Sequence, residues 1–331
     1  MTTQSPGVIP VVETVTDAPW LNCDNAHLAA LQQFYGVSEP SAAMGLQWSF
    51  ELRTTDEVPV TLRVPVLDSI ARETGLVFER RQLPLPGYYD DVAALVAEGT
   101  PLIVYGDAFH MPWLPYFGND SSAHPTILAG VTDDAFHIVE TYTNSTPWGR
   151  VVPGPARVPR PEFEKLVAAL GPGQRGEVLF LVSRVPANPT DPADALRANA
   201  EAVLRQVGER GDMATYAQWA RDNATDPEAM GRYDLGCWEV TRARSCHSVW
   251  LGRLAGTRPD LLPADLAQRF HEEIDLPWRR ASQFAFVNSQ RVAKGAKPST
   301  ASFDLVAGRL ADAETAFARD LLTHLDAKGA V

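Results

Sequence analysis

Three side chains of this sequence have the types and the order that cysteine-dependent acyl transfer uses, namely Cys23, His124 and Glu140. In that chemistry a thiolate attacks a carbonyl carbon, an imidazole moves protons, and a carboxylate holds the imidazole in one tautomer. The three residues can act together only if the elements that carry them meet in the fold.

Cys23 opens a predicted helix over residues 23–35. Asn22 is a preferred N-cap residue, so Cys23 takes the first helical position, where the partial positive charge of the helix end stabilises a thiolate. His27 lies one turn later on the same face. Its reach along its own helix is restricted, so we expect His27 to line a pocket and not to act as the base. The alternative for Cys23 is core packing, which is common for free cysteines.

His124 and Glu140 lie on two predicted strands. The stretch "TILAGVTDDAFHIVE" indicates a hairpin with a tight Asp-Asp turn. Folding back about that turn brings residues 124–128 beside residues 138–142, so the carboxylate can orient the imidazole. The alternatives are a strand-end histidine and a surface glutamate, although Glu140 interrupts an otherwise apolar strand.

Three further residues are candidates for substrate binding. Asp107 ends the apolar run "LIVYGD" and either binds an amine nucleophile or caps the local turn. Trp48 and Trp113 are expected as pocket walls, with core packing as the alternative for such aromatics.

Composition excludes several classes of function. The net charge of −12 argues against nucleic-acid binding, and three cysteines without paired spacing argue against a zinc site or a disulfide framework. No apolar run approaches the ~18 residues of a membrane span, and the N-terminal residues lack the features of a signal peptide. We therefore expect a cytoplasmic protein without a metal ion or a membrane partner.

The sequence changes character near residue 186. Residues 1–186 alternate short apolar runs with helical patterns at 23–35, 65–74, 89–98 and 161–170, which predicts an α+β domain with a central helix on an antiparallel sheet. Residues 187–331 show apolar residues at helical spacing throughout, which predicts a second, all-helical domain of about five helices.

The helical region contains the other two cysteines and two arginines that lie two positions apart. Cys237 and Cys246 lie mid-helix without a partner acid or base, so we expect them to be structural. Arg242 and Arg244 point to different faces of their helix. We expect both at the surface, with a phosphopantetheine phosphate or a substrate carboxylate as the alternative partner for one of them.

The stretches "NCDNAHLAALQQFYGVSEPSAAMGLQWSF" and "GTPLIVYGDAFHMPWLPYFGNDSSAHPTILAGVTDDAFHIVE" together resemble the papain-like N-terminal domain of the butirosin biosynthesis protein H family. The shared features are a helix-opening cysteine, the "FYG" helix end, the "MGLQW" turn, the "GTPLIVYGD" strand, the "WLPYFG" element and a strand histidine followed by an acid. The region after residue 186 is similar to the helical domain that follows in that family.

The resemblance implies acyl transfer in the biosynthesis of specialised metabolites such as antibiotics. A cysteine would take an acyl group from the phosphopantetheine thioester of an acyl carrier protein and pass it to a small-molecule amine, with no cofactor bound by the enzyme itself. Cys23 would be the nucleophile, His124 the general base and acid, and Glu140 the residue that orients the histidine.

The sequence also departs from the papain pattern. A glutamate replaces the usual asparagine or aspartate at the third position, and Asp17 stands where a papain-type glutamine is expected. We therefore expect the oxyanion hole to use the backbone N–H of Cys23 together with Asn22 or another nearby donor.

Two other functions fit the same residues. The first is a thioesterase or amidase, in which water resolves the acyl-enzyme. The second is a non-catalytic scaffold that holds a carrier protein, which the bulky "MGLQW" turn and the missing glutamine favour. The sequence specifies neither the acyl group, the acceptor nor the oligomeric state.

Overall fold

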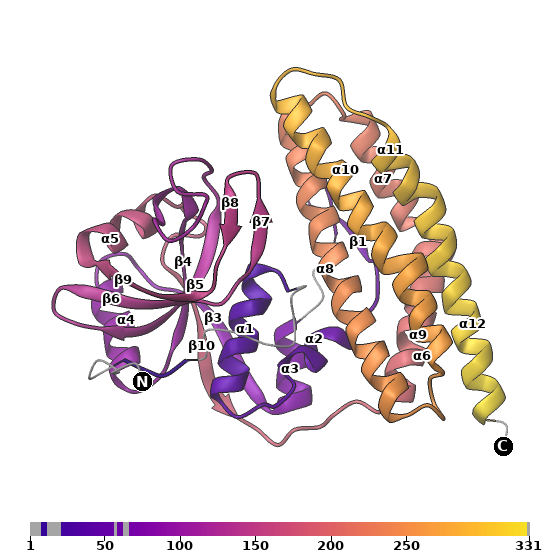
Figure 1. The fold of residues 1–331 in the computed structure, drawn as a ribbon, viewed down its shortest axis with the longest axis horizontal. Helices are drawn as coiled ribbons and strands as arrows, with labels where there is room; N and C mark the ends of the chain where they lie inside the picture. The colour runs from indigo at the N-terminus through magenta and orange to yellow at the C-terminus, as the bar shows by residue number, and fades with distance from the viewer. Residues whose placement is uncertain (1–7, 12–20, 56–57, 62–65, 330–331) are drawn as a thin grey trace. The chain divides into compact units, whose positions relative to one another are not determined.

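The computed structural model describes residues 8–11, 21–55, 58–61 and 66–329 (Figure 1). The chain divides into two compact units. Unit 1 comprises Met1–Ser41 and Leu67–Asn188, and unit 2 comprises Ala42–Val66 and Pro189–Val331. The division after residue 188 lies close to the joint predicted at residue 186, but residues 42–66 group with the helical region and not with the sheet. The reason is that this segment contributes buried aromatic side chains to the helical core.

Unit 1 is built on a six-stranded sheet with the strand order β3-β10-β4-β5-β6-β9 (Figure 1). All neighbouring strands in it are antiparallel, which confirms the predicted α+β class with an antiparallel sheet. The strands are β3 (Leu76–Gln82), β4 (Leu102–Asp107), β5 (Ala123–Val131), β6 (Ala135–Glu140), β9 (Gly154–Pro159) and β10 (Glu177–Arg184). A separate two-stranded ladder joins β7 (Asn144–Thr146) to β8 (Gly149–Val151).

The helices of unit 1 begin and end within two residues of their predicted bounds. They are α1 (Cys23–Phe34), α3 (Val66–Thr74), α4 (Tyr88–Ala97) and α5 (Arg160–Ala168), with the 3-10 turn η1 (Ala108–His110) after β4. Helix α1 contacts β5, and α5 packs on β4 and β6. The rings of Phe163 on α5 and Phe136 on β6 stack with centroids 4.0 Å apart. The short helix α2 (Pro40–Gly45) carries the chain from unit 1 to unit 2.

Unit 2 is helical apart from the β1–β2 ladder (Leu52–Thr55 with Val58–Thr61). Within the described part of the chain after residue 189, three of the five helical stretches contain a π-helical segment. The stretches are α6–η2 (Pro192–Val203, Leu204–Glu209), α7 (Asp212–Asp222), α8 (Pro227–Thr257), α9–η3–α10 (Ala264–Phe270, His271–Asp275, Leu276–Ala293) and α11–η4–α12 (Ala301–Asp304, Leu305–Leu310, Ala311–Gly329). Helices α8 and α10 lie side by side (Figure 1), and Thr241 Oγ1 donates a hydrogen bond to the Trp278 carbonyl across this contact.

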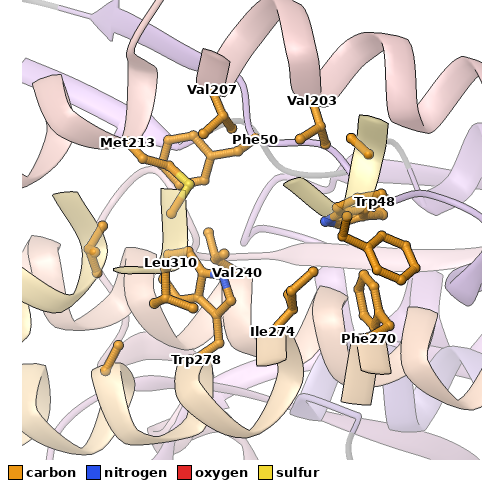
Figure 2. Packing of buried hydrophobic residues seen from close by; sticks show 14 of the residues in the cluster. Trp48, Phe50, Val203, Val207, Met213, Val240, Phe270, Ile274, Trp278 and Leu310 are labelled. Carbon is orange, nitrogen blue, oxygen red and sulfur yellow. The ribbon is translucent and has the colours of Figure 1, made fainter. Parts of the chain in front are cut away.

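The core of unit 2 is closed by aromatic residues from residues 42–66. Figure 2 shows Trp48 beside Phe270, and Phe50 near Met213, within the helical cluster. Trp48 is fully buried, with its ring centroid 5.1 Å from that of Phe270. The segment therefore belongs to the core of unit 2 by packing.

A buried ion pair ties the same segment to two helices. Arg244 on α8 pairs with Glu314 on α12, with Nη2 and Oε2 2.9 Å apart and both side chains at most 1% exposed. Glu314 also accepts hydrogen bonds from the indole nitrogens of Trp48 and Trp278, at 3.1 and 2.6 Å. The prediction that Arg244 lies at the surface was wrong, because Glu314 supplies a buried counter-charge that lies far away in the sequence.

A search of the described residues finds no helix that combines the length and the hydropathy needed to cross a membrane.

Candidate active site

Cys23 is the first residue of α1, as predicted, and its side chain is partly exposed. Asn22 caps the helix, with its Oδ1 accepting a hydrogen bond from the Asn25 backbone N–H at 2.8 Å. The next residue, Asp24, accepts a hydrogen bond from the Tyr105 hydroxyl on β4 at 2.6 Å. The helix end that carries the thiol is therefore capped and anchored to a central strand of the sheet.

The predicted hairpin brings His124 and Glu140 into contact. Strands β5 and β6 are joined by a turn in which the Thr132 N–H donates to the Ala135 carbonyl at 2.8 Å. His124 Nε2 lies 3.0 Å from Glu140 Oε2, and the two residues are 4% and 1% exposed. This contact uses Nε2, so Nδ1 is the ring nitrogen left for proton transfer.

Glu140 is held as a carboxylate. Burial alone raises the pKa of Glu140, but the charges and hydrogen bonds of His124 and His27 outweigh burial and hold the pKa well below its usual range. The Tyr142 backbone N–H also donates to Glu140 Oε1, at 2.9 Å. Sequence reasoning missed this third donor, although it comes from a residue only two positions away.

The prediction that His27 lines a pocket was wrong, because its side chain is 0% exposed. Its Nδ1 lies 2.6 Å from the Cys23 carbonyl oxygen, within α1. Its Nε2 lies 3.2 Å from Glu140 Oε1, an ion-pair distance without the alignment of a good hydrogen bond. Glu140 therefore lies between two histidines, His27 on α1 and His124 on β5.

Tyr116 lies beside this cluster and interacts electrostatically with Cys23. Its ring centroid lies 6.3 Å from that of His124, and the His124 ring in turn lies 6.1 Å from that of His27. Burial raises the pKa of Tyr116, and its electrostatic interaction with Cys23 acts in the same direction. The structure thus brings Cys23, His27, His124, Glu140 and Tyr116 together within unit 1.

The remaining predicted site residues have other surroundings. Asp107 caps η1, accepting hydrogen bonds from the Phe109 N–H at 3.0 Å and from the Ser121 hydroxyl at 2.8 Å. The structure therefore shows the capping role that was one of its two predicted roles. Trp113 is half-buried in the segment that follows η1.

Trp48 is not a pocket wall. The side chain is 0% exposed in the core of unit 2, which leaves no surface for a substrate. Asp17 lies outside the described residues.

The other two cysteines differ from Cys23. Cys237 and Cys246 are buried in α8. Burial raises the pKa of Cys246 to about 12. Such a buried, protonated thiol is a poor nucleophile.

Within the described ranges, no three His, Cys, Asp or Glu side chains gather in a group that could hold a metal ion. The arrangement offers a partly exposed thiol at a helix start, an imidazole whose Nε2 contacts a carboxylate, and that buried carboxylate. These are the parts of general-base-assisted nucleophilic catalysis. The sequence matches no protein-family model, and no curated protein matches it.

Proposed function

We propose that the protein is a cysteine acyltransferase that moves an acyl group from a thioester to an amine through an acyl-enzyme on Cys23. The observation that carries the proposal is the contact between His124 Nε2 and the buried Glu140 carboxylate, at 3.0 Å. It fixes the tautomer and orientation of an imidazole that shares a cluster with a partly exposed thiol at a helix start.

The proposed reaction has two halves. In the first, the Cys23 thiolate attacks the thioester carbonyl carbon, and the C–S bond to the leaving thiol breaks as His124 gives that thiol its proton. In the second, the amine attacks the acyl-enzyme while His124 takes the amine proton, and the bond to Cys23 breaks to release an amide. Glu140 orients the imidazole in both halves.

The identity of the thioester follows from the resemblance to the butirosin biosynthesis protein H family. On that basis unit 1 is papain-like, the donor is an acyl group on the phosphopantetheine arm of an acyl carrier protein, and the acceptor is a small-molecule amine in specialised metabolism. The capped start of α1 on the antiparallel sheet supports the papain-like assignment. The oxyanion is stabilised by the Cys23 backbone N–H and Asn22.

The test is intact mass spectrometry of the protein after incubation with acyl-pantetheine thioesters and with acylated carrier proteins. We expect an acyl adduct on the unaltered protein and none on Cys23→Ala, whose turnover falls by about 10³-fold or more. Cys246→Ala is the matched control, because it removes a buried thiol, and it should keep both the adduct and turnover. Equal adducts on the Cys23→Ala variant would refute the proposal.

The same experiment separates the two other functions. If the adduct decays to free acid at the same rate with and without amines, the protein is a thioesterase or amidase. If no thioester leaves an adduct and Cys23→Ala still binds an acyl carrier protein, the protein is a scaffold.

A further inference from the structure

Both ring nitrogens of His27 face hydrogen-bond acceptors. Nδ1 lies 2.6 Å from the Cys23 carbonyl oxygen, and Nε2 lies 3.2 Å from Glu140 Oε1. A carbonyl and a carboxylate only accept hydrogen bonds, and a histidine presents two N–H groups only when it is protonated. The side chain is 0% exposed, so bulk solvent does not complete either contact. The geometry therefore favours an imidazolium at this position.

Charge balance points the same way. Glu140 is 1% exposed, and a buried carboxylate without a counter-charge is strongly disfavoured. Besides His27, the titratable groups that interact with Glu140 are His124 on β5 and Tyr116 in the segment before β5. Asp24 on α1 interacts with His27, and Cys23 interacts with Tyr116. None of these except His124 can be positive, and His124 has to lose and regain a proton during acyl transfer. A second, permanent cation is needed if Glu140 is to stay charged throughout the reaction.

We propose that His27 is a permanently protonated positioning residue, which neutralises Glu140 so that His124 can release its proton during turnover. This role rests on the proposed acyl transfer. A lone buried carboxylate would hold the proton on His124, whereas a neutralised one still orients the ring through its hydrogen bond. The imidazolium also places a positive charge one helical turn from the Cys23 thiolate. When Cys23 is a thiolate, Glu140 is a carboxylate and both His27 and His124 are protonated, the two positive charges of this group balance its two negative charges.

The direction of the pKa shift agrees with this geometry. Burial acts to lower the pKa of His27, but Glu140 and the Cys23 carbonyl outweigh burial, and the pKa of His27 lies above its ordinary value.

The charge state can be measured on the unaltered protein without any substrate. Long-range ¹H–¹⁵N NMR spectra distinguish imidazolium from either neutral tautomer, and the His27 signal is assigned through its correlations to the backbone. We expect both nitrogens of His27 to stay protonated at about pH 8, where an ordinary histidine is neutral. A His27 ring with one bare nitrogen at that pH would overturn the proposal. This readout is independent of turnover, so the charge assignment and the proposed acyl transfer can fail separately.

The positioning role is tested by the pH profile of Cys23 alkylation with iodoacetamide in His27→Gln. Removal of a cation makes each neighbouring group hold its proton more tightly, so we expect the profile to move upward by about one pH unit. The matched control is His137→Gln, on the same strand as Glu140 but alternating to the opposite face of the sheet, and its profile should not move. An unchanged profile in a folded His27→Gln protein would contradict the role. If this variant does not fold, the NMR measurement decides alone.

Discussion

Three groups surround the Glu140 carboxylate: the His124 ring and the Tyr142 backbone N–H lie at hydrogen-bond distance, and His27 Nε2 lies at ion-pair distance. Part of the contact with His124 was predictable, because the tight Asp-Asp turn brings residues 124–128 beside residues 138–142. The face on which Glu140 lies could not be predicted, because the pairing of β5 with β6 shifts by one residue between Leu128 and Gly130, and such a shift moves side chains to the other face of the sheet. The contact with His27 was not predictable, because the sequence places His27 near Cys23 by helical spacing but says nothing about the strand that α1 meets. Tertiary contacts of this kind have no local signal.

Glu140→Gln removes a buried charge and leaves two histidines without their counter-ion. We expect the free energy of unfolding near pH 7 to fall by about 3–5 kcal/mol. Because the pKa of Glu140 is lowered in the folded protein, its stabilising contribution is present above the ordinary glutamate pKa and is lost as pH falls through the folded value. The difference in free energy of unfolding between the unaltered protein and Glu140→Gln should therefore become smaller in acid.

Denaturant unfolding at neutral and at acidic pH measures this difference. Glu164→Gln is the control, because Glu164 forms a surface pair with Arg160, and its effect should stay below about 1 kcal/mol. A Glu140→Gln protein as stable as the unaltered one at neutral pH would show that the carboxylate is not charged in the folded state.

Among helices and strands, those with clear end signals were predicted well. Helix α1 begins at its Asn22 cap as expected, and the four helices predicted for residues 1–186 match their predicted bounds within two residues. Capping residues and apolar spacing are local, so they can be read from the sequence alone. The distance between a strand and the helix packed on it depends on the side chains of both elements, so it cannot be predicted from the sequence of either one alone.

Gly106 illustrates a close approach between a strand and a helix. It pairs with His124 across β4 and β5, and a Cβ at this position would lie 2.2 Å from Leu166 Cδ1 on α5. We expect Gly106→Ala to push α5 away and to cost about 1–3 kcal/mol of stability. Gly171→Ala, where nothing lies within 4 Å of the added carbon, should leave the unfolding midpoint nearly unchanged. Thermal unfolding of both variants tests this, and equal midpoints would contradict the close packing.

For the molecule as a whole, the sequence predicted two parts but not the path of the chain between them. Residues 42–66 were assigned to the N-terminal part because they precede the change in composition near residue 186. Their partners lie in the helices that follow residue 189, and a few apolar side chains in a short segment carry no information about which core will bury them. The buried Arg244–Glu314 pair was missed for the same reason.

Within residues 42–66, Trp48 is fully buried and donates a hydrogen bond to Glu314. We expect Trp48→Ala to lower the stability of the helical unit by about 3–5 kcal/mol, because it leaves a cavity and removes a hydrogen bond to Glu314. Far-UV circular dichroism during denaturation measures the loss. Trp148→Ala, at a position that is 40% exposed, should cost less than about 1 kcal/mol. Similar losses in both variants would argue against a core role for residues 42–66.

Trp48 and Glu314 lie 266 positions apart in the sequence, and this separation also matters while the protein is being synthesised. The indole leaves the ribosome early, whereas the carboxylate that accepts its N–H is translated near the end of the chain. Unit 1 receives its last strand, β10, well before then. Nascent chains must therefore carry the side chains of Trp48 and Phe50 without their final core through most of translation. This interval is when chaperone binding or misfolding has the greatest opportunity to act.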